Sequence, residues 1–207
     1  MSPKALRQQH REQLRAAILD AAREEFVREG YENFSMRKLA SGIGYSPGTL
    51  YLHFESKADL LNALVEEGFE QLLQALGQAH DSDDSVQSLR NKLRAYIDFG
   101  LGHPNHYHFA FLLRRERRSE PVEPHSSFDV LRRAVRRCVE QGPFDSLDVE
   151  ITSQTLWSAI HGITSLLIVH PDFPWVGQNE VIDSVLNTTI EGLRSRAAVR
   201  PDAENKP

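Results

Sequence analysis

Residues 35–57 read Ser-Met-Arg-Lys-Leu-Ala-Ser-Gly-Ile-Gly-Tyr-Ser-Pro-Gly-Thr-Leu-Tyr-Leu-His-Phe-Glu-Ser-Lys, which is the pattern of two short helices joined by a tight turn. Ser35 and Ser46 are good N-cap residues, and Pro47 follows at a first helical position, where its missing N–H costs nothing. Gly44 lies between the helices, where a backbone without a Cβ can turn sharply. Apolar residues at helical spacing let the two helices face each other: Leu39, Ala40, Ile43, Leu50 and Phe54. The stretch therefore predicts a helix-turn-helix.

A helix-turn-helix places its second helix in the DNA major groove, so the polar and exposed side chains around it are candidate contacts. Arg37 can make a bidentate contact with guanine, Thr49 can bond to a base edge or a phosphate, and Leu52 offers only apolar contact. We expect phosphate contacts from Tyr51, His53 and Lys57. The predicted interface also includes the start of the second helix: Ser46, Pro47 and Gly48.

The motif is specific enough to suggest a family. The run Gly-Thr-Leu-Tyr-Leu-His-Phe at residues 48–54, followed by Ser56-Lys57, resembles the DNA-binding domain of the TetR family of bacterial transcriptional regulators. This resemblance covers roughly residues 11–65, and it implies a homodimeric repressor that a small molecule releases from an inverted-repeat operator in double-stranded DNA. The alternative is a helical small-molecule-binding or enzymatic protein whose hairpin is only structural, with Tyr51 and His53 as ordinary surface residues.

The distribution of charge is compatible with DNA binding, although the formal net charge of the 207 residues is −5. Residues 1–60 hold nine Lys or Arg and eight Asp or Glu, for a net charge of +1, whereas the remainder carries −6. Lys4, Arg7, Arg11 and Arg15 make the first fifteen residues locally basic. DNA affinity requires a basic contact face rather than a basic protein.

The composition indicates a globular protein of the cytoplasm. Hydrophobic residues make up 40% and charged residues 26%, which is ordinary for a soluble domain. A single cysteine excludes an internal disulfide and fits a reducing compartment. The first residues lack the apolar segment of a signal peptide, and the longest apolar run, residues 163–169, is interrupted by Thr164 and Ser165. We therefore expect no membrane association.

Helical periodicity continues through the whole chain, and no β pattern is present. Apolar residues recur every three or four positions from Arg11 to Arg28, before Gly30 ends that helix. Further helices are predicted by the same spacing near residues 56–76, 89–101, 130–139, 149–167 and 179–194, and residues 107–112 form a short, very apolar segment. The expected fold is all-α, with an N-terminal three-helix helix-turn-helix domain and a C-terminal helical regulatory and dimerisation domain.

The expected domain boundaries follow from these patterns. Residues 1–10 are polar without apolar periodicity and predict a disordered basic arm, which either follows DNA or is simply solvated. The DNA-binding domain is expected at 11–58 and the ligand-binding and dimerisation domain at 59–197, with a disordered tail at 198–207. The long apolar helices around Trp157 and at residues 181–193 predict pairing with a second copy as a four-helix interface.

Two shorter signals concern the C-terminal domain. Trp157 followed by His161-Gly162, and the segment Pro104 to Tyr107, resemble signatures of one C-terminal class within the TetR family. That resemblance implies an all-helical domain that binds a small molecule. Aromatic and apolar helices suggest an apolar or amphipathic effector, and the candidate lining is Phe69, Phe99, Phe109, Trp157 and His161. The alternative is that these side chains only fill the core.

Other reactive residues carry weaker signals. His103, His106 and His108 are clustered, but no acidic residue or cysteine lies among them, so we predict no metal site. Cys138 is in register with an apolar face, which favours core packing over redox sensing. The basic run 114–118 is expected to be a solvated loop. The sequence contains no phosphate-binding loop, no zinc-protease motif and no nucleophile elbow. We therefore expect that the protein has no catalytic residues, binds no cofactor and is not an enzyme.

Overall fold

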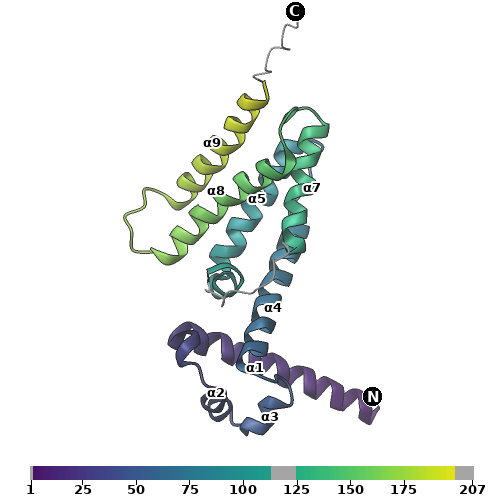
Figure 1. Cartoon of the computed structure of the whole chain (residues 1–207), viewed down its shortest axis with the longest axis vertical. Coiled ribbons are helices and arrows are strands. Elements are labelled where there is room, and N and C mark those ends of the chain that lie inside the picture. Colours follow the sequence, from purple (N-terminus) through teal and green to yellow (C-terminus); the bar gives the residue numbers. More distant parts are fainter. Residues whose placement is uncertain (1, 113–124, 199–207) are drawn as a thin grey trace, which may run out of the picture. The chain divides into compact units, whose positions relative to one another are not determined.

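The computed structural model describes residues 2–112 and 125–198, and these residues form helices and connecting turns without any β-strand, as predicted. They divide into two compact units (Figure 1). One unit comprises residues 2–68 and 108–112, and the other comprises residues 69–107 and 125–198. No helix in the described part of the chain is long and apolar enough to cross a membrane.

The first unit contains α1 (Pro3–Asn33), α2 (Met36–Gly42), α3 (Pro47–Tyr51), the beginning of α4 (Lys57–Gln78) and the π-helix η1 (His108–Leu112). Figure 1 shows α2 and α3 as a compact hairpin next to α1. Helix α1 is interrupted where the sequence predicts its end, because Gly30 has φ 75° and ψ 166°. Only glycine adopts this backbone conformation at little cost.

The N-terminal residues differ from the expected disordered arm, because residues 3–10 are the first turns of α1. Ser2 caps this helix by accepting a 3.2 Å hydrogen bond from the backbone N–H of Ala5. Pro3 occupies the first turn, where its fixed φ suits a helix. The residues that follow are mainly Ala, Leu, Arg and Gln, which are good helix formers. The prediction failed because it relied on apolar periodicity, which an exposed helix does not need.

The core of the first unit joins α1 to the hairpin and to α4. Its fully or almost fully buried members are Ile18, Ala22, Phe26, Leu39, Ala40, Leu50, Phe54, Leu60, Leu64 and Val65. The rings of Phe26 and Phe34 stack with centroids 3.8 Å apart, which fixes the corner between α1 and α2. Because the first three turns of α4 contribute to this core, the unit extends to residue 68 rather than to the expected boundary at 58.

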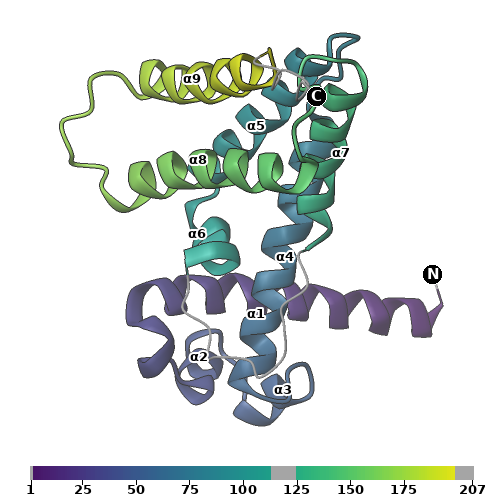
Figure 2. The same cartoon turned by 45° about the horizontal axis from the view of Figure 1, so that its top comes forward.

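The second unit contains the rest of α4, α5 (Ser85–Gly102), α6 (Pro104–Tyr107), α7 (Ser126–Glu140), α8 (Val149–Val169) and α9 (Gln178–Ala198). Helix α5 packs against α7, α8 and α9, and α8 lies beside α9 in both views (Figures 1 and 2). Asp84 and Asp148 cap α5 and α8 through their carboxylates, and Gly142 ends α7 with φ 97°.

The helices predicted in this part of the chain are therefore confirmed, with bounds extended by a few residues. Their shared core contains Leu89, Leu93, Ile97, Val135, Cys138, Phe144, Leu156, Ile160, Ile182, Leu186 and Ile190. The basic run at residues 114–118 and residues 199–207 of the expected tail lie outside the described residues.

Candidate nucleic-acid interface and effector site

The helix-turn-helix is held by the caps that the sequence predicts. The Ser35 hydroxyl accepts from the backbone N–H of Lys38 at 3.5 Å, and the Ser46 hydroxyl accepts from that of Thr49 at 3.1 Å. Gly44 makes the turn with φ 75°, and Pro47 begins α3. The Ser46 and Thr49 hydroxyls also bond to each other at 2.9 Å, so both side chains organise the start of α3.

The side chains around α3 divide into a buried and an exposed set. Leu50 is fully buried and Phe54 is 1% exposed, whereas Tyr51 is 49% and Leu52 is 76% exposed. Arg37 on α2, Pro47 and Gly48 are also exposed, and Thr49 is half-buried. Of the predicted DNA contacts, Arg37, Ser46, Pro47, Gly48, Tyr51 and Leu52 are therefore exposed, whereas Thr49, His53 and Lys57 are half-buried.

His53 lies at the end of α3 among cations of α1. Burial lowers the pKa of its imidazole, and the nearby charges of Arg11 and Arg15 lower it further. The Arg15 guanidinium also lies 4.9 Å above the ring of Phe54, within cation–π distance. Arg15 is not among the predicted contacts, although its position four residues after Arg11 in the sequence places both cations on one side of α1.

Lys57 has local partners in addition to any role at DNA. Its ammonium lies 4.1 Å from the ring centroid of Tyr31 and 5.9 Å from that of Phe34. It also donates a 3.4 Å hydrogen bond to the carbonyl of Glu32. The lysine therefore fastens the start of α4 to the corner between α1 and α2, which sequence spacing did not reveal.

The five candidate effector residues are divided between the two units. Phe109 belongs to the first unit, where its ring lies 5.9 Å from Phe26. Phe69 stacks on His125 at 4.4 Å, and the ring of Phe99 lies 5.5 Å from His103. Trp157 and His161 on α8 are neighbours, with ring centroids 5.6 Å apart. The structure therefore shows a direct contact for this pair of the expected lining.

Two tyrosines outside the predicted lining contact His161. The Tyr107 hydroxyl lies 2.6 Å from Nδ1 of His161, and the Tyr96 hydroxyl lies 3.1 Å from the same nitrogen. The two hydroxyls are 3.2 Å apart. Burial raises the pKa of Tyr96 to about 12, raises that of Tyr107 and lowers that of His161. Burial therefore favours the uncharged form of all three side chains.

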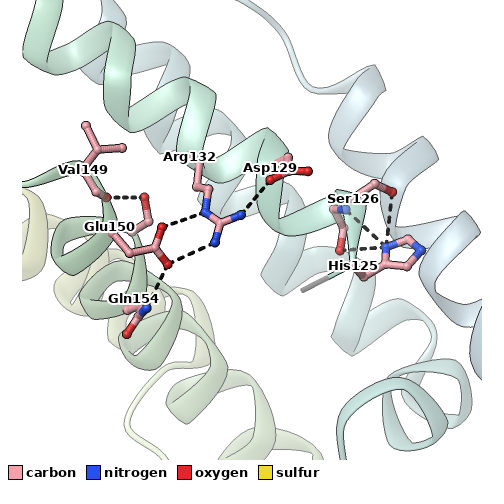
Figure 3. Close-up of polar contacts among 9 residues, drawn as sticks. His125, Ser126, Asp129, Arg132, Val149, Glu150 and Gln154 are labelled. Atoms are coloured by element: carbon pink, nitrogen blue, oxygen red, sulfur yellow. Dashed lines mark hydrogen bonds and ion pairs between the residues drawn. The ribbon is translucent and has the colours of Figure 1, made fainter. Parts of the chain in front are cut away.

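A polar network next to Trp157 joins α7 to α8 (Figure 3). The Arg132 guanidinium makes a bidentate contact with the Glu150 carboxylate at 2.8 and 3.1 Å, and it bonds to Asp129 at 2.8 Å. The hydrogen bond from Arg132 lowers the pKa of Glu150. Arg132 also lies 4.7 Å above the ring of Phe128, whose edge meets Trp157 at 5.9 Å. The network thus links α7 to α8, the helix that carries Trp157 and His161.

Cys138 and the histidines near residue 103 are packed against other side chains. Cys138 is fully buried, and burial raises the pKa of its thiol, so core packing is confirmed. His103 and His106 pack edge to face at 5.7 Å. Within residues 2–112 and 125–198, no group of three metal-ligating side chains has the arrangement of a metal site.

Comparisons with known proteins agree with this architecture. The family model described as bacterial regulatory proteins, tetR family, matches residues 18–64. A second model, described as the tetracyclin repressor-like C-terminal domain, matches residues 89–190. The matches therefore cover the helix-turn-helix and most of the second unit separately.

Individual relatives align over shorter parts. The chain is 32% identical over 98 residues to the HTH-type transcriptional regulator YfiR of Bacillus subtilis, covering 47% of this chain and 45% of YfiR. It is 36% identical over 90 residues to the HTH-type transcriptional activator FasR of Mycolicibacterium smegmatis, covering 43% of this chain and 41% of FasR. The chain thus spans less than half the length of these two relatives.

Among solved structures, the transcriptional regulator FadR of Bacillus subtilis in complex with stearoyl-CoA superposes with a TM-score of 0.68. The two chains are 20% identical over 84% of this chain and 97% of FadR, so the similarity is one of fold. The matched families and relatives are DNA-binding regulators and not enzymes. The chain belongs to the TetR family of helix-turn-helix transcriptional regulators.

Proposed function

We propose that this protein is a cytoplasmic, homodimeric repressor that binds an inverted-repeat operator and is released from it by a small molecule. The observation that carries the proposal is the capped α2–α3 hairpin, which leaves Arg37, Tyr51 and Leu52 exposed while Leu50 and Phe54 anchor it. Side chains presented in this way around a second helix suit the major groove. Contacts with the DNA phosphates position such a helix on the duplex. Arg37 is the side chain best suited to contact a base, because its guanidinium can bond to guanine in a bidentate manner.

The test is a gel shift with the DNA upstream of the protein's own coding region. The wild-type protein should retard this fragment in the presence of excess unrelated duplex. Arg37→Ala/Tyr51→Ala, which removes two exposed hairpin side chains, should lose the shift. Lys38→Ala is the matched control, because Lys38 is paired with Glu29 at 3.0 Å. Equal shifts for all three proteins would contradict the proposed role of the hairpin.

Dimerisation through α8 and α9 is supported by the composition of their exposed faces. On α8, Ile151 is 62%, Leu166 is 47% and Val169 is 55% exposed. Small side chains at three- and four-residue spacing accompany them: Thr155, Ser158, Gly162 and Ser165 on α8, and Val181, Ser184, Val185, Thr188 and Gly192 on α9. Such faces allow two helix pairs to approach closely and bury their apolar side chains.

The dimer is tested by sedimentation at micromolar concentration. Thr188→Glu places a charge in the middle of the α9 face and should produce a monomer, because the carboxylate would lose water without gaining a partner. Asn187→Glu is the matched control, since Asn187 bonds to Arg90 at 2.6 Å and a carboxylate there keeps that cation as a partner. If Thr188→Glu remains a dimer, the interface lies elsewhere.

The effector is proposed to be an apolar or amphipathic molecule that binds beside Trp157 and His161. The stearoyl-CoA bound by FadR, which shares the fold, makes long-chain acyl thioesters the first compounds to test. A ligand that prefers the DNA-free conformation weakens DNA binding by the ratio of its affinities for the two states. Stearoyl-CoA should therefore raise the melting temperature and release the operator, whereas coenzyme A should do neither. A panel of acyl chains without either effect would contradict this class of effector.

A further inference from the structure

The N-terminal turns of α1 carry four cations on one side of the helix. Lys4, Arg7, Arg11 and Arg15 recur at spacings of three and four residues, which places them within an arc of about 80° of the helix surface. All four side chains are exposed. Arg7 bonds to the backbone carbonyl of Pro3, and no carboxylate of the described residues forms an ion pair with any of the four. We call these four residues the α1 basic stripe.

The stripe continues the buried face of the same helix. Leu14, Ile18 and Ala22 follow Arg11 at the same three- and four-residue spacing, and the latter two are fully buried in the first unit. Beyond the edge of that core, the same side of α1 changes from apolar to basic. Figures 1 and 2 show that, within the first unit, the N-terminal end of α1 extends past the α2–α3 hairpin.

Contacts at the inner end of the stripe set its direction. The Arg15 guanidinium lies above the ring of Phe54, and Arg11 and Arg15 are close enough to His53 to lower its pKa, after the larger effect of burial. His53 and Phe54 directly follow α3. The stripe therefore lies on the side of α1 from which the α2–α3 hairpin projects, and not on the opposite side.

The other cations of this unit make the stripe unusual. Arg23 is paired with Asp20 and Glu67, Arg28 with Glu29, and Lys38 with Glu29. Among the described residues of the unit, the cations without such carboxylate partners are the stripe, Arg37 and Lys57. The cations of the first unit that lack an ion pair with a described carboxylate are thus found at the hairpin, at the start of α4 and along α1.

We infer that the α1 basic stripe is a second DNA-binding surface, which follows the phosphates of the duplex outside the bases contacted by the hairpin. The inference rests on the proposed function and deepens it. From Arg15 to Lys4 the helix rises about 16 Å, which corresponds to about five base pairs at 3.4 Å each. Because a helix keeps its charges in register, the stripe contributes affinity and orientation without reading base sequence.

Two variants separate a rigid stripe from general positive charge. The neutralised variant Arg7→Gln/Arg11→Gln removes two charges from each protomer. The relocated variant contains the same changes plus Gln9→Arg/Gln13→Arg, which restores the net charge on the far side of the helix. Residues 9 and 13 are exposed, so all the substitutions lie on the surface of α1. Comparing the helical circular dichroism and melting temperature of the three proteins verifies that α1 is retained.

The measurement is the affinity for an operator duplex with ten flanking base pairs on each side and for one without flanks, across a salt series. The wild-type protein should bind the longer duplex more tightly, and both variants should lose this preference. The slope of log affinity against log salt concentration should become shallower by up to about 3.6, because each phosphate contact contributes about 0.9 and a dimer loses four cations. The preference for particular bases should not change. If the relocated variant keeps the wild-type flank dependence and slope, the stripe assignment is wrong. If the wild-type protein does not prefer the operator to scrambled duplex, the proposed function itself fails.

Discussion

The Tyr107 hydroxyl lies 2.6 Å from Nδ1 of His161, a hydrogen-bond distance that joins the end of α6 to the middle of α8. The contact lies inside the second unit, where Tyr107 is fully buried. Burial lowers the pKa of His161, so the folded environment favours the neutral imidazole. The protonation state of His161 is therefore linked to the stability of the fold.

This linkage predicts a loss of stability in mild acid. Burial lowers the pKa of folded His161 below its ordinary value of 6.5, so above that pH both states carry a neutral ring. As the pH falls below 6.5, the unfolded chain takes up a proton before the folded chain does, and the free energy of unfolding decreases. His161→Asn keeps an acceptor but cannot titrate. Between about pH 7.5 and about pH 5.5 it should lose less stability than the wild-type protein in urea unfolding.

His80→Asn is the control for this experiment, because His80 is exposed and only its backbone carbonyl forms a hydrogen bond with the side chains of the described residues. It should reproduce the wild-type pH dependence, since the other histidines are unchanged. If His161→Asn also reproduces it, burial of His161 does not control acid stability.

Close packing around Gly100, beside Tyr107, predicts that an added methyl group there lowers the stability of the fold. A Cβ at Gly100 would collide with Cγ2 of Thr164 and would lie 2.9 Å from Cδ2 of Tyr107. Gly100→Ala should therefore lower the free energy of unfolding by about 1–3 kcal/mol. Gly102→Ala, two residues later on α5, has open space at that position and should be neutral or slightly stabilising. Thermal melts of both variants measure the difference, and equal melting temperatures would contradict this packing.

Much of the fold was predictable because helix signals are local. The caps at Ser35 and Ser46, the turn at Gly44 and the interruption at Gly30 each follow from the chemistry of one or two residues. Apolar periodicity then located the helices that bury a face. It missed the exposed start of α1, where helix propensity and the Ser2 cap act without any buried face.

The candidate sites were less predictable, because they depend on contacts between distant residues. His161 meets Tyr96 and Tyr107, which lie 65 and 54 residues away in the sequence. No local sequence pattern specifies that these three residues meet. Phe109, another aromatic residue of the predicted lining, packs on Phe26 in the first unit. The local structure of the hairpin was predictable because its caps and its turn lie within one short motif.

Arg37 remains our predicted reader of base sequence. It is exposed on α2 and forms no ion pair with the described residues, so its guanidinium is available for a bidentate contact. Arg37→Ala should cost about 1–3 kcal/mol of operator binding and relax the preference at one base pair in each half-site. Affinities for single-base operator variants measure this, with Lys38→Ala as the neighbouring control. An unchanged base preference in Arg37→Ala would transfer the reading role to another residue.

Lys57 is predicted to act on both stability and DNA affinity. Loss of the cation–π contact with Tyr31 in Lys57→Ala should cost about 0.5–1 kcal/mol of unfolding free energy. DNA binding should weaken alike for all sequences, with a salt slope lower by roughly one per lost phosphate contact. Tyr31→Leu keeps the charge and should reduce stability without changing the slope. If the two variants give the same salt slope, Lys57 contacts no phosphate.

The central claim, that the hairpins of a symmetric dimer read DNA, is tested most directly by selecting random duplexes with the purified protein and sequencing those it retains. The selected DNA should contain an inverted repeat whose half-site centres are related by about one helical turn or a multiple of it. In Arg37→Ala, selection should retain the repeat but lose the preference at one position in each half-site. Retention of duplexes without any common sequence, or of a single unrepeated site, would contradict the claim.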